Sequence, residues 1–218
     1  MLTFPYQSEL FKNIKKQKVD AMMNDLDFTI KKYMKNEVIF KGDEYIDSLG
    51  IILKGNVLIA KETSGGNKTM IALLDENSMI GEVMAISNNR ISNLVISSSD
   101  DTEIMFIPIR NIYKFNELKD NLIVLLAKKA FYMNKRVYYL QLKSIRGKLS
   151  RFLLDISEGR DSLTFSIPFN RQKMAEYLNV SRPSLSREMA RFKNEGLIDY
   201  YKESIKIIDK TGLEKYQE

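Results

Sequence analysis

The chain has 218 residues, 44% of them hydrophobic and 28% charged, so it has the composition of a folded protein of one or two domains. It contains no Cys and no His, which excludes disulfides, thiolate nucleophiles, zinc fingers, ordinary iron–sulfur clusters, Ser-His-Asp triads and haem ligated by His or Cys. Its 34 Lys and Arg against 28 Asp and Glu give a net charge of +6, which fits an acidic partner such as nucleic acid.

The sequence favours neither a membrane protein nor an exported one. The longest apolar run near the middle, residues 122–127, is far shorter than the ~20 residues of a membrane-spanning helix. The first basic residue is Lys12, whereas a signal peptide begins with its positive charges. The acids of the strand-rich region lie mostly in turns and lack the spacing of metal ligands. We therefore expect a cytoplasmic protein with no membrane partner, no metal, no catalytic residues and no enzyme activity.

The first half of the chain is rich in predicted strands. Residues 1–27 are typical of short helices, with apolar residues spaced among lysines. Residues 28–109 follow with short β-rich runs separated by turn-forming pairs such as Gly55-Asn56. The runs are Ile51–Leu53, Val57–Ala60, Met70–Leu74, Leu94–Ile96 and Ile104–Ile107. Short strands at this spacing predict an antiparallel sandwich or barrel.

A helical period begins near Asn111, and no Pro or Gly interrupts it up to Arg146. Apolar residues recur there at alternating steps of three and four, which is a heptad seam. The seam consists of Ile123, Leu126, Ala130, Met133, Val137 and Leu140, with Ser144 continuing the series. We expect this helix to dimerise the protein. The alternative is a long core helix that lies on the β-rich domain.

Gly147 is expected to break this helix and to place the domain boundary near residues 144–147. A second helix then carries Leu149, Phe152, Leu153 and Ile156.

Residues 168–193 predict a helix-turn-helix motif. Asn170 is the expected N-cap of a two-turn helix over residues 171–178. A three-residue turn follows at 179–181, and its last residue, Ser181, caps the next helix. Pro183 lies in the first turn, where its missing N–H is tolerated. A short helix, a tight turn and a second capped helix are typical of DNA-binding proteins.

The outward face of the second helix is basic and polar. It carries Arg182, Ser184, Ser186, Arg187 and Arg191. Arginine can bond guanine O6 and N7 together in the major groove. Six basic and two acidic residues give the segment 168–193 a net charge of +4, so most of the excess charge lies there. The alternative is a helical hairpin with a solvated basic face.

Two short strands, expected at 198–201 and 204–208, would form a wing beside the motif, with a turn at Lys202 and Glu203. Lys202 and Lys206 are candidates to contact phosphate.

The chain resembles the Crp/Fnr family of bacterial transcription regulators over nearly its whole length. The resemblance rests on the runs 181–188 and 194–198, and on 40–43, 51–57 and 80–82 of the β-rich region. It implies an α+β protein with an N-terminal antiparallel β jelly roll of the cyclic-nucleotide-binding type, a long dimerisation helix and a C-terminal winged helix-turn-helix. The implied domains are residues 1–110, 111–146 and 147–218. It further implies a homodimer on a near-palindromic site of double-stranded DNA, with recognition helices about 34 Å apart.

By this resemblance Arg187 takes the family's guanine-reading position. Arg182, Ser184 and Ser186 take positions that touch base edges or phosphate, and Asn170, Gln172 and Ser181 take positions that face phosphate. Arg171, Pro183, Arg191 and Lys202 complete our candidate DNA-binding set. Pro183 departs from the family, because many members carry there a Glu that accepts a hydrogen bond from cytosine N4. We therefore expect a half-site that keeps the guanine and differs at the adjacent pair.

The family's effector site is also partly recognisable. Members that bind cyclic AMP follow a Gly-Glu pair with an Arg-Ser pair that holds the cyclic phosphate. Here Gly81 and Glu82 are present, but the later pair is Ser92-Asn93, and Arg90 lies two residues earlier. A Ser-Asn pair cannot neutralise the phosphate charge. We therefore expect a small-molecule effector other than cyclic AMP. Its candidate pocket consists of Gly81, Glu82, Ser92, Asn93, Met133, Asn134 and Tyr138.

The sequence thus predicts a sequence-specific DNA-binding transcription regulator, with RNA polymerase as a further partner. Three alternatives stay open: a cyclic-AMP-responsive regulator of the same family, an effector-independent DNA-binding protein, and an architectural DNA binder with little sequence preference. The absence of Cys and His removes the family's iron–sulfur and haem sensors as they are usually built.

Overall fold

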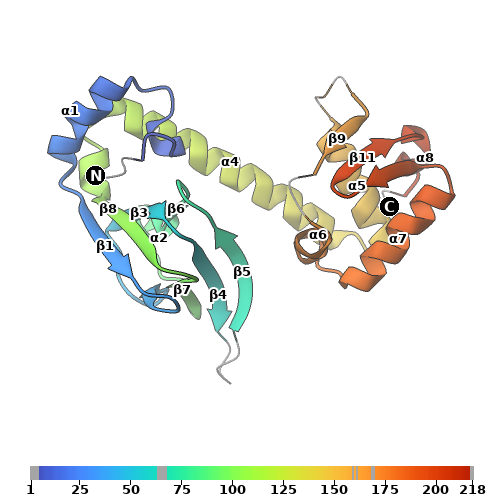
Figure 1. Cartoon of the computed structure of the whole chain (residues 1–218), viewed down its shortest axis with the longest axis horizontal. Helices are drawn as coiled ribbons and strands as arrows, with labels where there is room; N and C mark the ends of the chain where they lie inside the picture. The colour runs from blue at the N-terminus through green and yellow to red at the C-terminus, as the bar shows by residue number, and fades with distance from the viewer. Residues whose placement is uncertain (1–4, 63–67, 159, 161, 168–169, 217–218) are drawn as a thin grey trace. The chain divides into compact units, whose positions relative to one another are not determined.

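The computed structural model describes residues 5–62, 68–158, 160, 162–167 and 170–216 (Figure 1). The chain divides into two compact units, residues 1–127 and 128–218, so the division falls inside the long helix α4 (Asn116–Gln141). This point precedes the boundary expected near residues 144–147. Within the described residues, no helix is long and apolar enough to cross a membrane.

The N-terminal unit is a β-roll flanked by helices. Its helical elements are η1 (Glu9–Phe11), α1 (Lys16–Leu26), α2 (Glu82–Ser87), α3 (Ile109–Ile112) and the first part of α4. Its strands are β1 (Thr29–Tyr33), β2 (Val38–Lys41), β3 (Ser48–Lys54), β4 (Val57–Glu62), β5 (Lys68–Leu74), β6 (Met79–Ile80), β7 (Leu94–Ser98) and β8 (Thr102–Pro108). They form two four-stranded antiparallel sheets, of order β1-β8-β3-β6 and β2-β7-β4-β5. The predicted antiparallel roll is confirmed.

Strand β3 explains why this unit has two apolar clusters. Successive side chains of a strand point to opposite faces of the sheet. Ile52 packs between the two sheets with Phe40 and Ile96, whereas Ile51 packs on the other face of its sheet with η1, α1 and the start of α4. The strand is therefore buried on both sides and reads as one continuous apolar run.

The long helix begins later and ends earlier than expected. Asn111 lies in the short helix α3, where its buried amide donates to the carbonyl of Leu26 at 3.0 Å, and the chain turns before α4 begins. The first half of α4 buries Leu118, Leu122 and Leu125 in the core of the N-terminal unit. The side-chain amide of Asn121, in this half of α4, donates to the carbonyls of Leu10 and Lys12 and so anchors the N-terminal segment.

The C-terminal unit packs around one core. After α4 it contains α5 (Ile145–Ser157), β9 (Thr164–Ser166), α6 (Arg171–Leu178), α7 (Arg182–Asn194), β10 (Ile198–Tyr201), β11 (Ser204–Ile207) and α8 (Lys210–Glu214). Apolar side chains from all these elements join Tyr139 of α4 in that core. The strands form an antiparallel sheet of order β10-β11-β9, so the predicted wing has a third strand that the sequence did not indicate.

The junction between α4 and α5 corrects two expectations. Ser144 does not continue the seam, because it caps α5 by accepting a hydrogen bond from the Gly147 N–H at 2.9 Å. Gly147 breaks no helix, since it lies buried in the first turn of α5. The helix break instead occupies the residues between Gln141 and Ser144.

Candidate nucleic-acid interface

Helices α6 and α7 form the predicted helix-turn-helix. Asn170 caps α6 by accepting from the Lys173 N–H at 2.9 Å, and Ser181 caps α7 by accepting from the Ser184 N–H at 3.2 Å. Asn179 ends α6 in the left-handed conformation (φ 52°), which an asparagine tolerates. These local interactions fix where each helix begins and ends. Of the expected segment 168–193, residues 168 and 169 lie outside the described residues.

The inner faces of the two helices pack as the pattern predicts. Met174, Ala175, Leu178, Leu185, Met189 and Phe192 are all at most 1% exposed. Val180 of the turn packs on the same core. Because this face is filled, the opposite face of α7 is set toward solvent.

That outward face presents hydrogen-bonding groups. Arg182, Pro183, Ser186 and Arg187 are exposed, and Ser184 is half-buried. The Arg187 guanidinium donates to the Ser184 hydroxyl at 3.2 Å, and the Ser181 hydroxyl donates to the same oxygen at 2.8 Å. Among the residues that the structure describes, no carboxylate pairs with Arg187, so its remaining donors can face a guanine edge.

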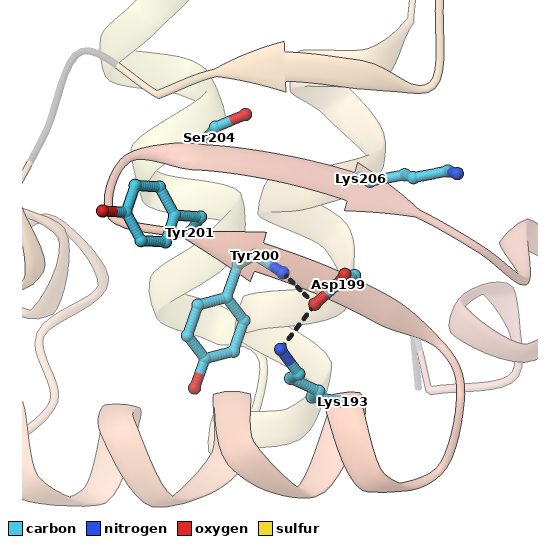
Figure 2. Close-up of a pocket in the computed structure, with 6 residues that line it drawn as sticks. All are labelled: Lys193, Asp199, Tyr200, Tyr201, Ser204 and Lys206. Atoms are coloured by element: carbon cyan, nitrogen blue, oxygen red, sulfur yellow. Dashed lines mark hydrogen bonds and ion pairs between the residues drawn. The ribbon is translucent and has the colours of Figure 1, made fainter.

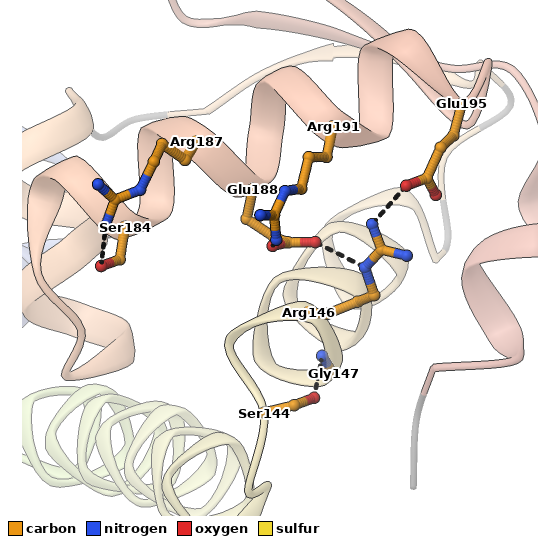
Figure 3. A network of polar contacts seen from close by, with 8 residues as sticks. All are labelled: Ser144, Arg146, Gly147, Ser184, Arg187, Glu188, Arg191 and Glu195. Carbon is orange, nitrogen blue, oxygen red and sulfur yellow. Dashed lines mark hydrogen bonds and ion pairs between the residues drawn. The ribbon is translucent and has the colours of Figure 1, made fainter.

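Arg191, one turn further along α7, is in a different environment. Its guanidinium donates to Glu188 at 3.3 Å, although its side chain is mostly exposed. Glu188 is buried and also accepts from Arg146 at 2.6 Å, while Arg146 donates to Glu195 at 2.6 Å (Figure 3). These carboxylates, Glu195 first, raise the pKa of the Arg146 guanidinium. The sequence indicated Arg191 but not the network that holds it.

The remaining candidates lie toward the wing and at the start of α6. Arg171 is half-buried with its guanidinium 4.8 Å from the ring centre of Tyr200, and burial lowers its pKa. Arg171 is therefore partly a packing residue. Gln172 is exposed and donates to Glu176 at 2.7 Å. Lys202 is exposed at the predicted wing turn, in the left-handed conformation (φ 53°), with its ammonium over the Tyr201 ring.

The seam on α4 is largely open to solvent. Ile123 (64%), Met133 (67%), Val137 (52%) and Leu140 (40%) are exposed large apolar residues, Ala130 is exposed, and only Leu126 is half-buried against the N-terminal core. A core helix lying on the roll would bury such residues. Their exposure in a single chain favours the dimerisation hypothesis over that alternative.

The candidate effector residues fall in two units. Gly81 has a φ of 75°, which favours glycine, and Glu82 is buried at the start of α2. Ser92 and Asn93 are exposed on the loop before β7. Met133, Asn134 and Tyr138 are exposed on the part of α4 that belongs to the C-terminal unit. The predicted pocket therefore combines two groups from different units, and it stays a prediction.

Two protein-family models match the chain. The model of the Crp-like helix-turn-helix domain matches residues 147–216, and the model of the cyclic nucleotide-binding domain matches residues 30–117. The first covers the capped helices and the wing, and the second covers the roll. Together they assign both units.

Curated relatives and solved structures agree with this assignment. The chain is 19% identical over 203 residues to the transcriptional activator protein FnrA of Stutzerimonas stutzeri, covering 88% of this chain and 82% of that protein. It is 18% identical to the cAMP-activated global transcriptional regulator CRP of Salmonella typhimurium, covering 81% and 88%. The catabolite activator protein of Thermus thermophilus has a similar structure, with a TM-score of 0.55 and 20% identity over 96% of this chain and 98% of that one.

Proposed function

Because the chain belongs to the Crp/Fnr family of DNA-binding transcription regulators, we propose that it binds a near-palindromic DNA site as a homodimer and regulates transcription under the control of a small-molecule effector. The observation that carries the proposal is the outward face of α7, where Arg187 is exposed and held by Ser184 on a capped helix. Arginine in this setting suits a guanine in the major groove.

The open seam of α4 supports the homodimer. Two copies that pair along it would bury the same residues twice, in the self-complementary manner of a two-fold interface. The pairing would place two α7 helices on successive half-sites of the same duplex. RNA polymerase and a location in the cytoplasm belong to this proposal as the expected partner and compartment of such a regulator.

Selection of bound sequences from a random DNA pool tests the proposal. We expect enrichment of an inverted repeat that contains a guanine in each half-site. The base pair next to that guanine should differ from the one that many family members select, because Pro183 stands where their carboxylate would read cytosine. Enrichment of no inverted repeat contradicts specific readout and favours an architectural binder. Size measurement on the bound complex gives the number of chains per site.

The second candidate is a cyclic-AMP-responsive regulator, which the relative named as cAMP-activated and the buried Glu82 favour. Against it, the exposed pair Ser92-Asn93 supplies no positive charge for the cyclic phosphate. Calorimetry with cyclic AMP separates the two, and we expect no saturable heat up to millimolar concentration. Saturable micromolar binding that a Glu82→Gln variant loses would establish the second candidate. Full DNA affinity without any added ligand would favour an effector-independent protein.

A further inference from the structure

The outer face of the wing carries a polar pocket next to the end of helix α7. It has a volume of about 360 Å³ and is lined by Lys193, Asp199, Tyr200, Tyr201, Ser204 and Lys206 (Figure 2). Lys193 lies in the last turn of α7, and the other five lie on β10 and β11. Helix α7 and the wing therefore form the pocket together, within one unit.

The charges of the pocket are arranged around Asp199. Its carboxylate accepts from the Lys193 ammonium at 2.6 Å and from the Tyr200 N–H at 2.8 Å. Lys206 stands opposite Asp199 in the pairing of β10 with β11. The hydrogen bond from the Lys193 ammonium to the Asp199 carboxylate lowers the pKa of Asp199 and raises that of Lys193. The lining of the pocket therefore combines two lysines with one carboxylate, of which Lys193 is paired with Asp199, and its net charge is +1.

The ion pair is open to solvent. The side chains of Lys193 and Asp199 are 50% and 54% exposed, so water screens their attraction and the pair contributes little free energy. A stronger competitor for the ammonium groups can therefore displace the carboxylate at low cost. The hydroxyls of Ser204 and Tyr201 add donors at the same pocket.

We propose that this pocket binds a backbone phosphate of the bound DNA, and that Asp199 competes with that phosphate for Lys193. The inference rests on the proposed function, because it requires the helix-turn-helix to hold DNA. A phosphate oxygen offers the lysines a negative charge and hydrogen-bond acceptors, as the Asp199 carboxylate does. While Asp199 keeps its charge, binding the phosphate only exchanges one ion pair for another. The wing therefore restrains affinity without contributing to sequence choice.

The decisive variant is Asp199→Asn, which keeps the shape and the acceptor for the Tyr200 N–H but removes the charge. We expect severalfold tighter binding to specific and non-specific duplexes alike. We also expect the slope of log K against log salt to steepen by ~0.9, the contribution of one phosphate. Fluorescence anisotropy on the selected site and on a scrambled duplex, at several salt concentrations, measures both.

Two controls make the test specific. Glu214→Gln removes one exposed negative charge on α8, so it reports the effect of net charge alone. In a protein that already carries Lys193→Gln and Lys206→Gln, Asp199→Asn should raise DNA affinity no more than Glu214→Gln does. An equal gain for Asp199→Asn and Glu214→Gln, or a gain that survives without the lysines, overturns the proposal. If the unaltered protein binds DNA and Asp199→Asn binds with the same affinity, this inference alone is wrong. If the unaltered protein binds no duplex, the proposed function is wrong as well.

Discussion

Helix α7 and the second half of helix α4 use their apolar residues in opposite ways. In α7, Leu185, Met189 and Phe192 are fully buried in the core of the C-terminal unit, and the exposed face is mainly basic and polar. In α4, Met133 and Val137 are exposed. The apolar face of the first helix is buried within its own unit, whereas the apolar stripe of the second stays exposed among the described residues.

The difference indicates which kind of partner the exposed face of each helix suits. A helix with a filled inner face and a polar outer face needs no further protein, and its outer face is available to DNA. An exposed heptad stripe is stabilised only when a second helix covers it. Four predictions about these two helices follow, in order of the expected effect.

The largest effect should come from a charge in the seam. Val137→Glu would place a carboxylate in the interface, so we expect monomers in sedimentation experiments. DNA affinity should fall by ~10²–10⁴-fold, because the two half-sites are no longer bound through one linked molecule. Gln141→Glu adds the same charge at the exposed end of α4, off the seam, and should stay dimeric. A dimeric Val137→Glu protein would refute the seam as the interface.

Removing the guanidinium of Arg187 tests the outward face of α7. Arg187→Ala should cost ~1–3 kcal/mol on the selected site and much less on unrelated duplexes. Arg191→Ala is the matched variant, and because Glu188 already engages Arg191 we expect a smaller loss that is similar on all sequences. Anisotropy with both duplexes measures the ratio. Equal losses on all sequences for Arg187→Ala would mean that it contacts phosphate instead of a base.

The cap of α7 should contribute to the stability of the C-terminal unit. Ser181→Ala removes the hydroxyl that accepts from the Ser184 N–H, so the free energy of unfolding should fall by ~0.5–2 kcal/mol. Ser186→Ala removes an exposed hydroxyl from the same helix and should stay within about 0.5 kcal/mol of the unaltered protein. Urea unfolding followed by circular dichroism measures both, since the chain has no Trp. Similar losses in the two variants would argue against the cap.

The smallest effect concerns the end of α4. Tyr139 is buried and donates to the Asp155 carboxylate at 2.6 Å, and burial, followed by this hydrogen bond, raises its pKa above the ordinary 10.0. The folded state therefore prefers the protonated phenol. Its stabilisation is complete below pH 10 and is lost as the pH rises further. Unfolding free energy should fall less steeply above pH 10 in Tyr139→Phe than in the unaltered protein, and parallel curves would contradict this linkage.

Local chemistry made much of the C-terminal unit predictable. The caps Asn170 and Ser181, the three-residue turn and the buried stripe of α7 all follow from neighbours in the sequence. The wing strands β10 and β11 matched their expected positions within one residue. Strand β9 was missed because three residues carry too little alternation to be recognised, and its partner β11 lies 38 residues later.

Long-range interactions were not predictable. The burial and pairing of Glu188 could not be predicted, because its partner Arg146 is 42 residues away and no local pattern links them. The start of α4 was predicted too early. Asn111 lies in the separate helix α3, where it bonds to the carbonyl of Leu26, and a contact across 85 residues leaves no local pattern in the sequence. The seam was predicted from its period, yet the period alone could not tell an exposed stripe from a buried one.

In the proposed dimer, the exposed stripe of α4 would also determine how the regulator responds to its own abundance. A fold that is finished only by a second copy is stabilised by mass action, so the dimer fraction rises with the number of chains. At low copy number, occupancy of a two-fold operator would follow the square of the chain concentration. A modest change in gene dosage would then become a larger change at the promoter, with no ligand involved.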